Sequence, residues 1–89
     1  IILMDINQLI AIIKKKLLNQ IEIDNILIED KSFLHKNHPG NKQNKFHLKI
    51  SLKSKELKKM NRIESNKKIY NILDEELKKS IHSLQILID

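Results

Sequence analysis

Histidine is the residue type in this sequence that is best suited to binding chemistry, and three of the four histidines lie close together. His35, His38 and His47 fall within SFLHKNHPGNKQNKFHLKI, residues 32–50, which also holds the only Pro and the only Gly of the chain. His82 follows near the C-terminus, in KKSIHSLQILID. Neutral imidazole is a good ligand for a divalent metal ion. The pattern therefore raises the question of whether these histidines form a site or simply occupy a polar loop.

The spacing of the loop histidines leaves both interpretations open. His35-x-x-His38 with His47 does not match a closed zinc site, because no carboxylate or thiolate stands at a matching offset. A solvated loop with incidental histidines is the simpler interpretation. A hydrolytic centre is disfavoured, because Ser32 and His35 lack a Gly-rich nucleophile turn and an evident oxyanion hole. The single Gly also provides no phosphate-binding glycine loop, and we expect a protein that is not an enzyme.

Composition and charge narrow the possible partners. The chain has 89 residues, enough for one small domain with one modest core. Its net charge of +6 and pI near 9.6 suit an anionic partner such as nucleic acid or an acidic protein surface. We discount this signal, because nearly all the basic residues are Lys, Arg62 is the only Arg and aromatic residues are scarce. The lack of Cys excludes disulfides and any Cys-ligated metal site made by this chain alone.

The ends of the chain and its apolar runs bear on its organisation. No apolar run reaches the length needed to span a membrane. The sequence opens IILMD, so residues 1–4 are interpreted as an N-terminal extension or the end of a truncated upstream segment. We expect a single domain over residues 5–89 that is a monomer when alone. The compartment is left open between cytoplasmic and mitochondrial.

Hydrophobic periodicity predicts the elements that position the histidines. Residues 5–19 have apolar side chains at helical spacing, and Asp5 with Gln8 forms a capping-box pattern. Further helical segments are predicted over 54–63, as a turn or short helix, and over 65–79, as one long helix. Strands are predicted over 26–30, 46–52 and 81–88, with a polar loop from Lys31 to Lys45.

Alternation along the predicted strands places two of the histidines. His47 alternates with the apolar residues of strand 46–52, so it is expected on the solvent-facing side as a surface residue that supports the loop. His82 has the same parity as Leu84, Ile86 and Ile88 in the last strand. We therefore expect it on the core-facing side, either as a hydrogen-bonded histidine at the edge of the core or as a ligand.

The order of these elements predicts the fold class. The first two strands can pair antiparallel across the loop, and the last strand follows a helical crossover, so it should run parallel to the second. We expect a small two-layer α+β domain in the order α-β-β-α-α-β, with a three-stranded mixed sheet and helices on one face.

Four segments in this order resemble the BolA-like family, from about Asp5 to the C-terminus. They are IEDKSFLH at 28–35, FHLKISLKS at 46–54, KIYNILDEEL at 68–77 and SIHSLQI at 80–86. The chain departs from the family pattern by a longer loop around His38 and by Leu48 where Phe is usual. Lys58 stands in place of a usual turn Gly, and residues 65–67 read Ser-Asn-Lys in place of Arg-His-Arg.

The resemblance implies a class II KH-like fold and a non-enzymatic role. Family members partner monothiol glutaredoxins and share a two-iron, two-sulfur (2Fe-2S) cluster with them, in cluster assembly, delivery or iron homeostasis. The resemblance implies that His82 is one cluster ligand and His35 the second, with His38 as the alternative loop ligand. Because the chain has no thiol, the Cys ligand and glutathione would come from the partner.

The resemblance also implies an alternative function, a nucleic-acid-binding transcriptional regulator. In that case the basic residues around the predicted turn would contact phosphates, and affinity would fall steeply with salt. The candidate residues are Lys58, Lys59, Arg62, Lys67 and Lys68.

Overall fold

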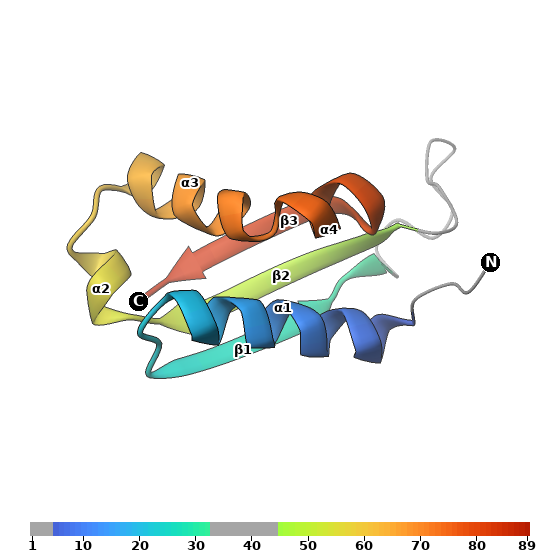
Figure 1. Cartoon of the computed structure of the whole chain (residues 1–89), viewed down its shortest axis with the longest axis horizontal. Helices are drawn as coiled ribbons and strands as arrows, with labels where there is room; N and C mark the ends of the chain where they lie inside the picture. The colour runs from blue at the N-terminus through green and yellow to red at the C-terminus, as the bar shows by residue number, and fades with distance from the viewer. Residues whose placement is uncertain (1–4, 33–44) are drawn as a thin grey trace.

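One layer of the molecule is a three-stranded sheet, and helices cover one of its faces (Figure 1). The computed structural model describes residues 5–32 and 45–89. In chain order the elements are α1 (Ile6–Gln20), β1 (Asn25–Asp30), β2 (Phe46–Lys53), α2 (Lys55–Lys58), α3 (Arg62–Ile72), α4 (Asp74–Lys79) and β3 (Ile81–Ile88). β1 runs antiparallel to β2, which lies in the centre and runs parallel to β3. The predicted fold class is confirmed.

The first helix forms as its sequence predicts. Asp5 accepts a hydrogen bond from the Gln8 backbone N–H at 2.8 Å, and the Gln8 side chain accepts one from the Asp5 N–H at 3.1 Å. This capping box satisfies donors that the first helical turn leaves unpaired. Leu9, Ile13 and Leu17 are buried and form the inner face of α1. No helix within residues 5–32 and 45–89 has the length and apolar character needed to cross a membrane.

The core lies between the helices and the covered face of the sheet. Its buried hydrophobic residues are Leu9, Ile13, Leu17, Ile21, Ile28, Leu48, Ile50, Leu52, Leu57, Ile69, Leu73 and Ile81. They come from α1, α2, α3 and all three strands, so a single cluster joins the two layers. Burial of each such Leu or Ile side chain contributes about 1.5–3 kcal/mol, which makes this cluster the main source of stability.

The helices after β2 begin and divide at places that the sequence prediction missed. The helix predicted over 65–79 is two helices, α3 and α4, which meet at Leu73. α3 begins three residues earlier than predicted, because Asn61 caps it. The Asn61 side chain accepts a hydrogen bond from the Glu64 N–H at 2.8 Å and donates one to the Glu64 carboxylate at 2.7 Å. The Asn-x-x-Glu spacing is a helix-start signal of the same kind as that at Asp5.

The pairing of β2 with β3 contains a register shift at the start of β3. Phe46 lies opposite Ile81, but His47 lies opposite Ser83, so His82 is an extra residue between two paired positions. An extra residue of this kind, a β-bulge, redirects a side chain and interrupts the alternation of faces. We refer to residues 81–83 as the β3 bulge.

The β3 bulge overturns the expected placement of His82. Alternation counted back from Leu84 and Ile86 puts His82 on the core-facing side, and that prediction is wrong. Ile81 takes the buried position at the start of the strand, with 3% of its surface exposed, whereas His82 is exposed. The parity count fails because it assumes an uninterrupted strand, and pairing with β2 inserts one residue.

Candidate functional site

Two of the four histidines meet where β3 begins. The ring centroids of His47 and His82 lie 4.8 Å apart, with their planes tilted by 58°. His47 is the second residue of β2, and His82 belongs to the β3 bulge. Within the described part of the chain, the exposed His82 imidazole makes no hydrogen bond, and its ring contact is with His47. It is therefore a nitrogen donor that a ligand can reach.

His47 is buried, and the prediction that it is a solvent-facing surface residue is wrong. Only 5% of its surface is exposed, and its Nδ1 lies 2.7 Å from the Ser83 hydroxyl oxygen. The residue still alternates with the core residue Leu48, so its parity was read correctly. The expectation fails because the β3 bulge brings His82 and Ser83 together against the His47 ring.

The base of the loop is tied to the same place. The His47 carbonyl accepts a hydrogen bond from the Lys31 N–H at 2.7 Å, and the His47 N–H donates to the Ser32 hydroxyl at 3.0 Å. The Ser32 N–H in turn donates to the Asp30 carboxylate at 2.9 Å. The chain therefore enters the loop beside His47 in a fixed position.

The proposed loop ligands are not placed by the structure. His35 and His38 lie outside the described residues, so their role as second ligand stays a prediction. His35 follows Ser32 by three residues, and the anchored loop base therefore starts the loop beside His82. No group of three His, Cys, Asp or Glu side chains suited to a metal ion occurs within residues 5–32 and 45–89.

The sequence prediction missed Ser32 and Ser83 as residues of this site. A signal existed for both. Asp30-Lys31-Ser32 directly follows a strand, where short polar side chains bond to neighbouring backbone. Ser83 is a small polar residue next to His82 in a mostly apolar strand. Their partner could not be identified from the sequence, because both contacts depend on the position of His47.

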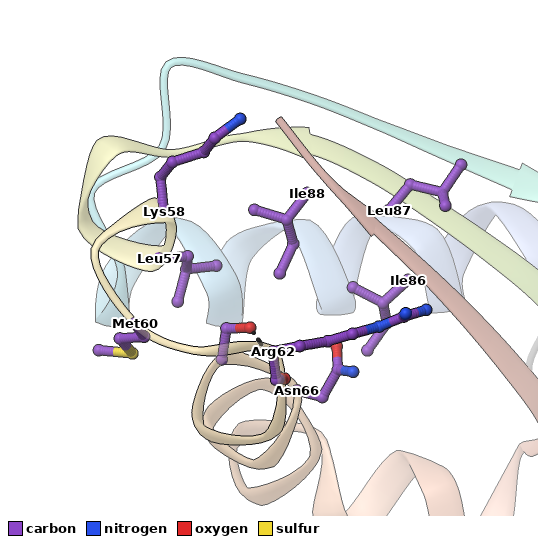
Figure 2. Close-up of a pocket in the computed structure, with 9 residues that line it drawn as sticks. Leu57, Lys58, Met60, Arg62, Asn66, Ile86, Leu87 and Ile88 are labelled. Atoms are coloured by element: carbon purple, nitrogen blue, oxygen red, sulfur yellow. Dashed lines mark hydrogen bonds between the residues drawn. The ribbon is translucent and has the colours of Figure 1, made fainter.

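Lys58 and Arg62, two of the candidate nucleic-acid residues, line a pocket at the opposite end of β3. The pocket has a volume of about 370 Å³ and is lined by Leu57, Lys58, Met60, Arg62, Ser65, Asn66, Ile86, Leu87 and Ile88. Figure 2 shows apolar side chains from α2 and β3 around it and Arg62 extending toward Ile86. Neither Lys58 nor Arg62 forms an ion pair with a described residue, so both charges face solvent.

The other candidate cations do not join this pocket. Lys68 is engaged by Glu56, with 2.6 Å between its Nζ and the carboxylate. That hydrogen bond, together with one from the Glu22 backbone N–H, lowers the pKa of Glu56 below its ordinary 4.5. Lys59 and Lys67 are exposed. The structure thus brings two of the five candidates to one surface and neutralises a third.

Comparison with known proteins covers most of the chain. A family model described as BolA-like protein matches residues 17–88. "Protein BOLA1, chloroplastic" of Arabidopsis thaliana is 31% identical over 77 residues, which cover 83% of this chain and 48% of that protein. "DNA-binding transcriptional regulator BolA" of Haemophilus influenzae is 31% identical over 75 residues, covering 84% and 70%. The chain therefore spans about half the length of the Arabidopsis relative.

Solved structures agree with the sequence comparison. BolA1 from Arabidopsis thaliana superposes with a TM-score of 0.74 at 29% identity, over 89% of this chain and 87% of that one. The BolA domain of SufE1 from Arabidopsis thaliana gives the same TM-score and coverage at 25% identity. The matched residues include both strands that meet at the β3 bulge. On sequence and fold together, this chain belongs to the BolA-like family.

Proposed function

We propose that this protein is a non-enzymatic partner of a monothiol glutaredoxin and shares a 2Fe-2S cluster with it. The observation that carries the proposal is the exposed His82 imidazole, which the β3 bulge turns away from the core beside an anchored loop base. The loop that begins there carries His35 and His38. One histidine from the strand and one from the loop would form the chain's share of the ligands.

The donor set of the chain suits a shared cluster. Clusters of this type need four ligands and accept two imidazoles in place of two thiolates on one iron. The chain has no Cys, so the sulfur ligands would come from the glutaredoxin active-site Cys and glutathione. Two neutral imidazoles carry two fewer negative charges than two thiolates, which raises the reduction potential and makes that side of the cluster sensitive to pH.

The role of this chain in such a complex is to hold and release cargo. His82 would bind from a strand that the sheet fixes, whereas the second histidine would bind from a loop. A ligand on a loop can close over the cluster and withdraw from it. One ligand on a strand and one on a loop suit cluster delivery. They also suit a role in iron homeostasis, in which binding and release of the cluster would signal how much cluster is available.

The test is a titration of cluster-loaded monothiol glutaredoxin with this protein, followed by visible absorption and circular dichroism. The wild-type chain is expected to give a saturable one-to-one spectral change, and His82→Ala is expected to abolish it. Gln85→Ala, also exposed on β3, is the matched control and should behave as wild type. His35→Ala and His38→Ala then identify the loop ligand. An unchanged spectrum with wild-type protein contradicts the proposal.

A second candidate function, nucleic-acid binding, is favoured by the pocket that holds Lys58 and Arg62. A relative from Haemophilus influenzae carries the name DNA-binding transcriptional regulator. Fluorescence anisotropy with labelled single- and double-stranded DNA tests this candidate across a range of salt concentrations. Lys58→Ala/Arg62→Ala should lower affinity and flatten the salt dependence, by roughly one unit of slope per phosphate contact. Lys14→Ala/Lys15→Ala, exposed on α1, is the matched control.

A further inference from the structure

The buried imidazole of His47 has a position that packing alone does not explain. β2 alternates inward residues with residues on the open face of the sheet, and His47 belongs to the open face. It is nevertheless 5% exposed, and burial of a polar ring is costly unless its nitrogen is hydrogen-bonded. The hydrogen bond between Nδ1 and the Ser83 hydroxyl, 2.7 Å long, offsets that cost for one of the two ring nitrogens.

Contacts from two separate parts of the chain converge on His47. Its backbone bonds to Lys31 and Ser32 at the loop base, at 2.7 Å and 3.0 Å. Its ring contacts the β3 bulge, through the hydrogen bond to Ser83 and the 4.8 Å ring contact with His82. One residue therefore fixes the start of the loop and the two exposed residues of the bulge in relation to each other.

The β3 bulge by itself leaves the His82 side chain weakly directed. His82 has no paired position on β2, and an exposed side chain on an edge strand can exchange among staggered rotamers. The His47 ring lies against one side of the His82 ring at a tilt of 58°. This contact removes part of the space through which the His82 ring can turn.

We propose that His47 is a positioning residue for His82. Its ring holds the His82 imidazole in one orientation, and this orientation favours ligand binding by His82. The first part concerns the protein alone. The second part rests on the proposed function, because it assumes that His82 binds a shared cluster. Groups that support a ligand in this way are commonly worth about tenfold or more in affinity.

The orientation of His82 is measured directly in the protein without any partner. Three-bond couplings to the His82 side chain, measured by NMR on labelled protein, report whether χ1 occupies one rotamer or averages over several. The wild-type chain is expected to show one rotamer. His47→Ala and His47→Thr, which both remove the ring, are expected to show averaging. Thr also keeps a β-branched side chain suited to a strand, so it serves if the Ala variant fails to fold.

Two further variants separate the ring from the hydrogen bond. His47→Phe keeps a ring against His82 but removes Nδ1, so it is expected to restore the single rotamer. Lys49→Ala, on the same face of β2, is the matched control and should leave His82 unchanged. A single His82 rotamer in a folded His47→Ala or His47→Thr variant overturns the proposal, as does averaging in the wild-type protein.

The glutaredoxin titration then tests the second part. His47→Thr is expected to weaken complex formation by about tenfold while keeping the spectral change that His82→Ala abolishes. Unchanged affinity with averaged His82 couplings would overturn the link to the cluster and leave the positioning role intact. Absence of the spectral change with the wild-type chain would instead contradict the proposed function. The coupling measurement would still decide whether His47 orients His82.

Discussion

Polar side chains from neighbouring elements lie at both ends of β3, and they differ in burial and in hydrogen bonding. At its start, His47 is buried and its nitrogen, its N–H and its carbonyl are all hydrogen-bonded. At its end, Lys58 and Arg62 line a pocket without an ion-pair partner among the described residues. The first arrangement fixes one exposed imidazole in direction. The second places two exposed charges near apolar side chains.

This difference matches what each kind of ligand demands. Ligation of a metal needs a nitrogen held within a small angular range. An imidazole whose ring is held by a neighbouring group is therefore a better ligand than one that turns freely. Attraction of an anion depends mainly on charge and distance, and exposed cations on long side chains supply both. Under the two proposed functions, the start of β3 would serve directional binding and its end electrostatic attraction.

The largest effect on stability is expected from His47→Ala. Removal of a buried ring leaves a gap in the structure, and the expected loss is about 2–3 kcal/mol of the free energy of unfolding. His82→Ala removes an exposed side chain, and its effect is expected within about 0.5 kcal/mol. Urea denaturation of both variants measures the contrast. Equal losses would show that the two histidines do not differ in this way.

The next largest effect is expected at the other end of β3, from Ser54→Ala. Ser54 is fully buried, donates to the Glu22 carbonyl at 2.7 Å and accepts from the Leu57 N–H at 3.2 Å. Loss of this helix cap should cost about 1–2 kcal/mol. Ser83→Ala, whose partner His47 stays in place, is the useful comparison. A negligible cost for Ser54→Ala in chemical denaturation would show that this helix cap does not stabilise the fold beside the pocket.

A smaller effect, dependent on pH, is expected for Glu56. Its folded-state pKa is lowered, first by the Lys68 hydrogen bond and then by the Glu22 N–H. The carboxylate therefore stabilises the fold at pH values above 4.5, and this contribution is lost as the pH falls through the lower folded pKa. Urea midpoints from about pH 5 to about pH 3 should fall more steeply for wild type than for Glu56→Gln. Parallel curves would contradict this assignment.

The smallest effect on stability is expected for Lys58→Ala/Arg62→Ala. Both side chains are exposed and without ion pairs among the described residues, so the free energy of unfolding should change by less than about 0.5 kcal/mol. The glutaredoxin titration should shift by no more than about threefold at low salt, since exposed charges affect mainly encounter. Loss of the cluster-dependent spectral change in this variant would contradict the proposal that the cluster binds at the start of β3, beside His82.

Local patterns in the sequence were enough to predict the fold. The helical spacing around Leu9 and Ile13, the capping residues of α1 and the alternation of Leu48 and Ile50 predict elements that the structure contains. The β-loop-β and helical-crossover order then fixes the antiparallel and parallel pairings. These predictions succeed because they depend on residues that lie near each other in the chain.

The candidate site was predicted less completely. His82 was identified as a ligand through the family resemblance; the structure shows that it is exposed, and its role as a ligand stays a prediction. Strand alternation, however, placed His82 on the core-facing side and His47 on the solvent-facing side. Both errors come from one source, the extra residue in β3.

The sequence by itself determined the elements, their order and the supply of donors: four histidines and no thiol. The tertiary structure decided which of these donors are exposed. A register shift is a property of two paired strands, and here the pair is separated in the chain by three helices. Because alternation within β3 contains no information about its register with β2, the contact of His47 with His82 and Ser83 emerges only when the sheet is assembled.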